Sequence, residues 1–220
     1  MKDTIMKNAN SKNDMKVIAI CGLIGSGKGS VADILVGEFG FEKLSFADSL
    51  KDMIASIFGW QRNLLEGDTK ESREWREQVD EWWSARLAIP NLTPRWVLQY
   101  WGTEVCRVGF HEEIWVASIE RKLSRAMNSN MKYNNIVIPD TRFPNEIKMI
   151  RKLGGQVWAV KRGEDPDWLI NLITRGEEPN DIHPSEWSWV TENVDNLISN
   201  DGTIDDLKHK VSTLLDNIRI

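Results

Sequence analysis

The stretch Lys16-Val-Ile-Ala-Ile-Cys21, followed directly by Gly22-Leu-Ile-Gly-Ser-Gly-Lys-Gly29, decides the fold of this chain. The first six residues form a short apolar run that is typical of a strand buried on both faces. The next eight contain four glycines and a lysine, and a helical pattern follows from about Ser30 to Phe39. A buried strand, a glycine-rich turn and a helix in this order predict a phosphate-binding loop.

The spacing Gly22-xxxx-Gly27-Lys28 has a physical reason. Glycines let backbone N–H groups converge on phosphate oxygens, and the helix N-terminus adds partial positive charge. Lys28 is expected to reach the β and γ phosphates of ATP. The glycine spacing does not fit the GxGxxG pattern of dinucleotide sites. The residues expected to contact ATP are Gly25, Ser26, Gly27, Lys28, Gly29, Ser30 and Val31.

One position departs from the usual phosphate loop. The hydroxyl residue that normally follows the lysine and binds Mg²⁺ is replaced by Gly29, with Ser30 one position later. Either Ser30 contributes from its displaced position, or the nucleotide and waters hold most of the metal ion. Mg²⁺ tolerates the second arrangement because it keeps several waters in most such sites.

The rest of the chain alternates strands with helices. This order predicts one α/β domain of the P-loop kinase type over residues 15–220, with a parallel sheet of about five strands flanked by helices. Residues 1–14 are polar and are expected to form a disordered tail, while residues 60–92 are interpreted as a charged helical insertion. Further strands are expected at 43–46, 135–139, 156–161 and 196–199, and further helices at 48–58, 93–102, 112–127, from 144 to before 154, and from after 202 to about 218.

Charged residues follow the strands at the edge where parallel sheets place their sites. Asp48 and Lys51 come after the second strand, Asp140 and Arg142 after the third, and Arg162 after the fourth. Asp140 is placed to hold a water on Mg²⁺, and the planar guanidinium of Arg142 suits a phosphate. A helix cap remains the alternative for Asp140, and a surface ion pair for Arg142. Ser30 and Asp140 are thus the candidate metal ligands.

Residues 162–192 contain several glycines and prolines and are expected to be irregular. In nucleotide kinases of this fold a mobile lid occupies this part of the chain and excludes water from the reaction. Arg162 and Arg175 are the lid residues that could neutralise charge on the transferring group. A plain surface loop is the alternative.

Composition restricts the class of protein. The chain has 220 residues, a formal charge of −5 and no polybasic block, which argues against binding to duplex nucleic acid. Its two cysteines have no zinc or disulfide spacing, which fits a reducing cytoplasm. No apolar run is long enough to cross a membrane. The expected partners are small nucleotides, and a homodimer is compatible with the sequence.

The sequence resembles the bacteriophage deoxynucleoside monophosphate kinases over roughly residues 16–215, with 60–92 matching least. Members of that family often carry the loop hydroxyl one position late, as Ser30 is here. Animal phosphomevalonate kinases look similar in the phosphate loop and around Asp140 and Arg142, and they are the nearest rival. The resemblance rests on Ser26-Gly-Lys-Gly-Ser30, Phe46-Ala-Asp-Ser-Leu-Lys51, Leu98-Gln-Tyr-Trp-Gly-Thr103, Trp115-Val116, Val137-Ile-Pro-Asp-Thr-Arg142 with Glu146, His183, and Ser199-Asn-Asp-Gly202.

The resemblance implies transfer of the ATP γ-phosphoryl group to a deoxynucleoside 5′-monophosphate, giving a diphosphate and ADP, in the cytoplasm of the host if the chain is encoded by a phage. A P-loop protein that only binds or hydrolyses nucleotide is the alternative from another class. Relatives often have basic residues where this chain has Ile24 and Gly25, and Arg107 is the candidate replacement. The expected catalytic residues are Lys28, Asp140, Arg142 and Arg162. The expected acceptor-site residues are Asp48, Lys51, Trp101, Gly102, Thr103, Arg107, Asp140, Arg142 and Glu146.

Overall fold

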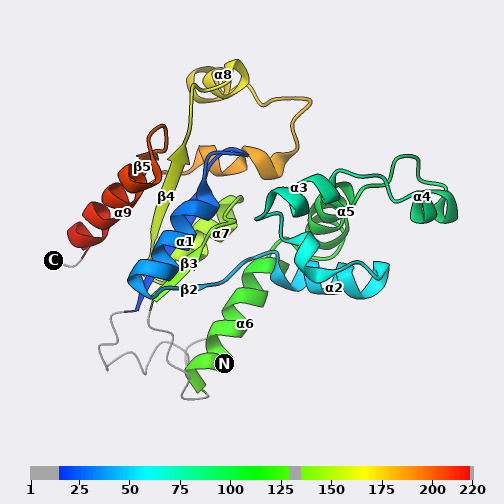
Figure 1. The fold of residues 1–220 in the computed structure, drawn as a ribbon, viewed down its shortest axis with the longest axis horizontal. Coiled ribbons are helices and arrows are strands. Elements are labelled where there is room, and N and C mark those ends of the chain that lie inside the picture. The colour runs from blue at the N-terminus through cyan, green and yellow to red at the C-terminus, as the bar shows by residue number, and fades with distance from the viewer. Residues whose placement is uncertain (1–14, 129–134, 219–220) are drawn as a thin grey trace.

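A five-stranded parallel sheet forms the centre of the molecule (Figure 1). The computed structural model describes residues 15–128 and 135–218, so the tail predicted at 1–14 lies outside it. The strand order is β2-β3-β1-β4-β5, and all neighbouring strands are parallel. The predicted α/β class is confirmed. The strands are β1 (Lys16–Cys21), β2 (Glu42–Lys43), β3 (Asn135–Ile138), β4 (Gln156–Lys161) and β5 (Asn196–Ser199).

Both faces of the sheet are buried, because successive side chains of a strand point to opposite faces. Along β1, Val17, Ala19 and Cys21 belong to one core cluster, while Ile18 and Ile20 belong to the other. Helices α1 (Lys28–Phe39) and α9 (Ile204–Ile218) pack on the Ile18 face. The opposite face is covered by α2 (Asp48–Phe58), α6 (Ile114–Asn128) and α7 (Pro144–Lys152).

Residues 60–92 contain three short helical elements. Together with the next helix they form an arm, residues 60–100, that projects to the right of the sheet in Figure 1. Phe58 at the end of α2 stacks on Trp60 and contacts Trp83, which joins the arm to the core. The predicted helix at 93–102 is α-helical only to Tyr100 and continues as a π-helix. The elements are η1 (Arg62–Leu65), α3 (Lys70–Arg76), α4 (Glu81–Leu87), α5 (Pro94–Tyr100) and the π-helix η2 (Trp101–Val108).

Strand β2 is shorter than the predicted range of 43–46. Only Glu42 and Lys43 pair with β3, and the chain then turns away from the sheet. The reason is tertiary, because the backbone N–H groups of Phe46 and Ala47 donate to the side chain of Asp140 and not to a neighbouring strand.

Residues 162–192 are more regular than expected. They contain the helix α8 (Asp167–Arg175) and two short 3₁₀ turns, η3 (Pro184–Glu186) and η4 (Ser188–Thr191). The glycines and prolines that predicted an irregular segment are helix boundaries here, since Pro166 precedes α8 and Gly176 ends it. Helix α8 stands at the top of Figure 1, and no helix among the described residues is long and apolar enough to span a membrane.

Candidate active site

The phosphate loop predicted at residues 22–30 connects β1 to α1. Gly27 has a positive φ of 99°, and a Cβ there would lie 2.1 Å from Nδ2 of Asn200, so only glycine fits. The side chain of Asn200, which follows β5, donates to the carbonyl oxygen of Ser26 at 2.9 Å. Two segments distant in sequence therefore hold the loop in shape.

Lys28 folds back onto this loop. Its Nζ donates to the carbonyl oxygens of Gly22 and Leu23 at 2.7 and 2.8 Å. Burial, together with the positive charge of Arg142, lowers the pKa of Lys28 to about 8. A phosphate group that replaced these two carbonyl oxygens as hydrogen-bond acceptor would stabilise the charged form of the Lys28 amine.

The loop also has features that fit an anionic ligand. The Oγ of Ser26 is buried without a hydrogen-bond partner, which is costly unless a ligand supplies one. A Cβ at Gly25 or Gly29 would meet nothing within 4 Å, so the space beside the loop is open. Val31 differs from the other predicted contacts, because its side chain is fully buried in the core and its N–H donates to Gly27.

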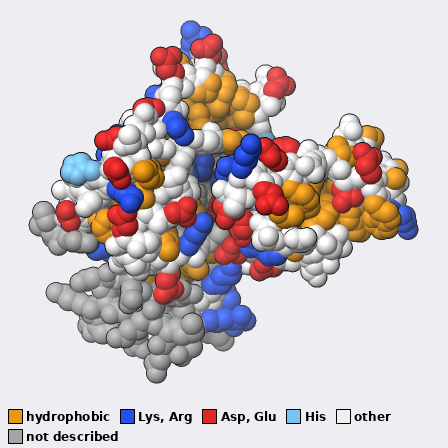
Figure 2. Space-filling view, in the orientation of Figure 1, with side chains coloured by type: hydrophobic (Ala, Val, Ile, Leu, Met, Phe, Trp, Pro, Cys, Tyr) orange, Lys and Arg blue, Asp and Glu red, His pale blue; other side chains and the backbone are white. Residues whose placement is uncertain are grey.

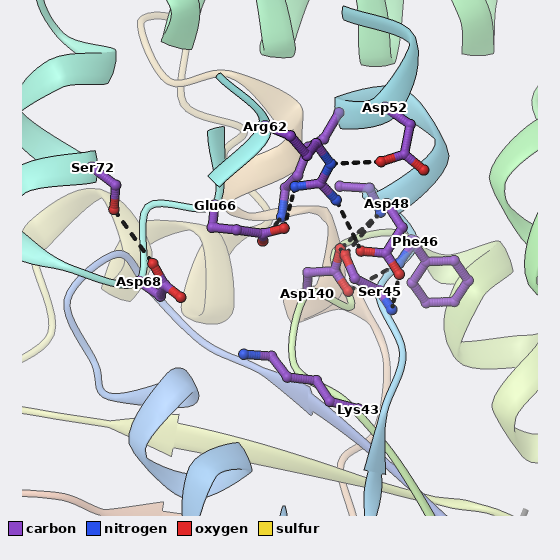
Figure 3. A network of polar contacts seen from close by, with 12 residues as sticks. Lys43, Ser45, Phe46, Asp48, Asp52, Arg62, Glu66, Asp68, Ser72 and Asp140 are labelled. Atoms are coloured by element: carbon purple, nitrogen blue, oxygen red, sulfur yellow. Dashed lines mark hydrogen bonds and ion pairs between the residues drawn. The ribbon is translucent and has the colours of Figure 1, made fainter. Parts of the chain in front are cut away.

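Asp140 follows β3 and binds the loop after β2 (Figure 3). One carboxylate oxygen accepts from Ser45 Oγ at 2.6 Å and from Ala47 N at 3.0 Å, and the other accepts from Phe46 N at 3.1 Å. A carboxylate has about four acceptor positions, so little capacity is left for a further donor. Asp140 therefore fixes residues 45–47 at the carboxyl end of the sheet.

Asp48 at the start of α2 forms an ion pair with Arg62 of the arm (Figure 3), and Lys51 in the same helix forms one with Glu66. Arg62 of η1 contacts Asp48 at 3.5 Å and also pairs with Glu66. Lys51 donates to the same Glu66, and its side chain is only 11% exposed. In this structure both predicted acceptor-site residues bind protein groups that join α2 to η1.

Arg142 lies two residues beyond Asp140 and contacts the lid segment. Its Nη1 donates to Ser185 Oγ at 3.3 Å and to Glu186 Oε1 at 3.2 Å. Its side chain is 40% exposed, so part of the guanidinium remains accessible. The positive charge of Arg142 is also among the causes that lower the pKa of Lys28.

Two arginines from the arm join Arg142. Burial, Arg95 and Arg142, in that order, lower the pKa of Arg76. The Nε of Arg76 is buried without a partner, and its guanidinium occupies the space that a Cβ of Gly67 would need. Arg95 lies 3.9 Å from the same oxygen of Glu186 that Arg142 contacts. Arg95 and Arg142 thus share one oxygen of Glu186, and Arg95 also pairs with Glu77 at 3.2 Å. Like charges that share a carboxylate repel one another, so a further anion would stabilise this cluster.

Arg107 and Glu146 form a buried ion pair, and Glu146 contacts the backbone of Arg142. Arg107 Nη2 donates to Glu146, and its guanidinium lies 3.9 Å from the centre of the Phe143 ring. Glu146 also accepts from Arg142 N at 2.7 Å and from Phe143 N at 3.1 Å. Burial raises the pKa of Glu146 to about 7, while Arg107 opposes this rise. The pair therefore holds the backbone at the start of α7.

The remaining predicted residues lie in η2, after β4 and at the end of α8. Trp101, Gly102 and Thr103 begin η2, where Trp101 packs edge-on against Phe58 and Gly102 O accepts from Trp115 Nε1 at 2.8 Å. Arg162 is exposed beyond β4. Arg175 at the end of α8 is 65% exposed and pairs with Glu177.

Mg²⁺ is implied for a chain of this kind, and the residues fit an ion held mainly by phosphates and water. The described residues contain no cluster of three His, Cys, Asp or Glu side chains that could hold a metal. Ser30 lies in the first turn of α1, beside the loop, and Asp140 lies at the end of β3. Mg²⁺ is often bound through one or two protein groups in such sites.

Two comparisons decide the family. The model of the deoxynucleotide monophosphate kinase family matches residues 72–211. A putative deoxynucleotide monophosphate kinase of Acanthamoeba polyphaga mimivirus is 30% identical over 211 residues, which cover 92% of this chain and 97% of that protein. The chain belongs to the deoxynucleotide monophosphate kinase family. It is an enzyme.

Two further comparisons reach more distant proteins. The deoxynucleotide monophosphate kinase of Enterobacteria phage T4 is 26% identical over 131 residues, which cover 58% of this chain and 48% of the phage protein. The chain thus spans about half the length of that relative. Dephospho-CoA kinase from Campylobacter jejuni has a TM-score of 0.45 at 16% identity, and the match covers 93% of this chain and 97% of that chain.

The structure adds residues that the sequence reasoning missed. Arg76, Arg95 and Glu186 were not predicted as site residues. Thr93 and Pro94 mark the start of the helix that carries Arg95, but no local pattern indicates that the Arg95 side chain lies near Glu186, the partner of Arg142.

The Arg107–Glu146 pair leads to a prediction of stability. Arg107→Met should lower the free energy of unfolding by about 3–5 kcal/mol, because Glu146 would remain buried without its cation. For a chain of this size the melting temperature should fall by roughly 6–20 °C. Thermal melts measure this. The double variant Arg107→Met/Glu146→Gln should regain most of the loss, and an unchanged melting temperature in Arg107→Met would contradict the assignment.

Proposed function

We propose that the chain transfers the γ-phosphoryl group of ATP to a deoxynucleoside 5′-monophosphate and releases ADP. The observation that carries this proposal is the pair of cationic groups at the carboxyl end of the sheet. Lys28 belongs to the phosphate loop, and Arg142 forms a second cluster with Arg95, which contacts the same oxygen of Glu186, and with Arg76. A protein that only hydrolyses nucleotide needs no second cluster of arginines.

The two groups have different roles in this proposal. The loop amides, Ser26 Oγ and Lys28 bind the phosphates of the donor, since the serine lacks a partner and the lysine contacts only loop carbonyls. The arginine cluster binds the acceptor phosphate and offsets charge in the transition state, because arginine forks match phosphate oxygens. Mg²⁺, when bound, neutralises charge on the donor phosphates.

Positioning carries most of a phosphoryl transfer, and this chain has several groups that position the reactants. Asp140 holds residues 45–47, and the Arg107–Glu146 pair holds the start of α7 directly after Arg142. Residues 162–192, with the exposed Arg162, act as a lid that excludes water, because water would otherwise compete with the acceptor. The acceptor pocket extends to Gly102 and Thr103.

The test is release of ADP from ATP in the presence of different acceptors. The panel contains the four common deoxynucleoside monophosphates, their ribose counterparts and phosphomevalonate. We expect turnover with at least one deoxynucleoside monophosphate and none with phosphomevalonate. Turnover with phosphomevalonate alone would favour the rival small-molecule kinase, and acceptor-independent release would favour a nucleotide hydrolase or switch.

A second prediction concerns the metal ion. Ser30→Ala should keep part of the Mg²⁺-dependent activity, whereas Asp140→Asn should lose more. An asparagine keeps only one acceptor oxygen, so at least one of the three hydrogen bonds to residues 45–47 would be lost. The measurement is kcat over a series of Mg²⁺ concentrations. Comparable losses in the two variants would show that the direct contact of Ser30 matters as much as Asp140.

A further inference from the structure

A chain of hydrogen bonds joins the lid segment to two other parts of the candidate site. Arg142 Nη1 donates to Ser185 Oγ at 3.3 Å. Ser185 Oγ lies 2.8 Å from His183 Nδ1, and His183 Nε2 lies 3.2 Å from Glu104 Oε1. The four residues come from the end of β3, the η3 turn and the π-helix η2.

The direction of each hydrogen bond follows from its neighbours. Ser185 Oγ accepts from Arg142, so its own O–H is available to His183 Nδ1. The backbone N–H of Ser185 also donates to Nδ1, at 3.2 Å, so Nδ1 acts as an acceptor. The proton of the ring therefore lies on Nε2, which donates to Glu104. With this tautomer, each hydrogen bond from Arg142 to Glu104 has one donor and one acceptor.

The last residue in this series of hydrogen bonds, Glu104, lies beside the residues expected to form the acceptor pocket. Glu104 directly follows Thr103 on η2, and Gly102 is tied to α6 through Trp115. A π-helix of this kind often marks a functional site. The hydrogen bonds thus connect the helix that carries Gly102 and Thr103 with the arginine proposed to bind the acceptor phosphate.

We propose that His183 is a positioning residue for the acceptor site, which sets the guanidinium of Arg142 through Ser185 and ties it to η2 through Glu104. This inference rests on the proposed function. Arg142 is a long side chain that is 40% exposed, and its other protein contact, Glu186, is shared with Arg95. Among the described residues 162–192, Ser185 is the partner of the Arg142 guanidinium that no other arginine shares.

The turn itself does not depend on Glu104. His183 caps η3 through the Ser185 N–H, Trp187 Nε1 donates to Ile182 O at 3.0 Å, and Ser188 Oγ donates to Pro184 O at 2.8 Å. These local contacts hold residues 182–188 together. A role in positioning can therefore be separated from a role in folding.

Three variants make this separation. His183→Asn keeps an oxygen that can cap the turn, but its shorter side chain cannot also reach Glu104. Ser185→Ala removes the step between His183 and Arg142. Ser188→Ala is the matched control, because it removes a hydroxyl from the same segment that contacts Pro184 and not Arg142.

We expect the KM for the deoxynucleoside monophosphate to rise about tenfold in His183→Asn and in Ser185→Ala, the size expected for a hydrogen bond to a charged group. The KM for ATP and the melting temperature should stay close to the wild-type values, and Ser188→Ala should behave like the wild type. Because His183 acts through Ser185, the double variant should be no worse than Ser185→Ala alone.

Several results would overturn the inference: additive losses in the double variant, equal increases in both KM values, or the same loss in Ser188→Ala. Binding of inorganic phosphate, measured by calorimetry, separates this inference from the proposed function. If the wild type phosphorylates no monophosphate, the proposed function fails. His183→Asn should then still weaken phosphate binding relative to Ser188→Ala, and equal binding would overturn the positioning role itself.

Discussion

We expect the Lys28→Ala variant to lose at least about 10³-fold in kcat while its fold stays intact, a loss of the size seen when a group that stabilises transferring phosphate is removed. Lys28 is the only cation of the predicted phosphate loop, residues 22–30. The fold should tolerate the change, because the two hydrogen bonds that the variant loses are offset by relief of a buried charge near Arg142. ATP turnover and thermal melts measure the two effects.

The control is Lys70→Ala, which removes an exposed lysine that pairs with Glu74 on the arm. Its turnover should match that of the wild type. A pH series adds a second readout. Since the pKa of Lys28 is lowered to about 8, ATP binding above that pH requires uptake of a proton. The dissociation constant of ATP should then rise by up to about tenfold per pH unit above pH 8, and Lys28→Ala should lack this rise. Near-normal turnover in Lys28→Ala would remove the loop from the mechanism.

Arg142→Lys should reduce kcat/KM for the acceptor by about two orders of magnitude or more. Charge-assisted hydrogen bonds contribute about 1.5–3 kcal/mol each, and every 1.4 kcal/mol corresponds to roughly tenfold. Lysine keeps the charge, but a point charge cannot reproduce the planar fork, nor can it reach Ser185 and Glu186 in the same geometry. The affinity for ATP should barely change, because the loop holds the donor.

The measurement is a pair: calorimetry with ATP, and kcat/KM for dGMP or dTMP, on wild type and variant. Arg151→Lys is the matched control, since Arg151 pairs with Asp195 away from the phosphate loop. It should leave both quantities unchanged. Equal losses of ATP affinity and acceptor use in Arg142→Lys would assign Arg142 to the donor side.

The tryptophans of residues 60–92 differ in their surroundings. Trp60, Trp75 and Trp83 pack together near Phe58. Trp82 is nevertheless 63% exposed on α4, and hydrophobic side chains gather on the arm in Figure 2. Adjacent tryptophans on a helix point in different directions, so only the packed structure tells which of the two is buried.

The sequence alone determined the sheet, the phosphate loop and the resemblance to the family. These features depend on contiguous residues: β1 is an apolar run, the loop has its glycines and Lys28 at fixed spacing, and Pro144 starts a helix. Local patterns of this kind specify backbone conformation, because hydrophobic period and glycine placement act over a few residues.

Only the tertiary structure decided which side chains meet at the site. Arg76, Arg95 and Arg142 come from α3, α5 and the loop after β3, and Glu186 from residues 162–192 contacts both Arg95 and Arg142. It also showed that Asp140 shortens β2 by binding residues 45–47. Contacts of this kind join segments that are far apart in the sequence, such as Ser45 and Asp140, which are separated by 95 residues. They arise from how the arm and residues 162–192 pack on the sheet. Hydrophobic periodicity in the sequence does not predict these contacts, because they depend on charges and hydrogen bonds that come together only after the chain has folded.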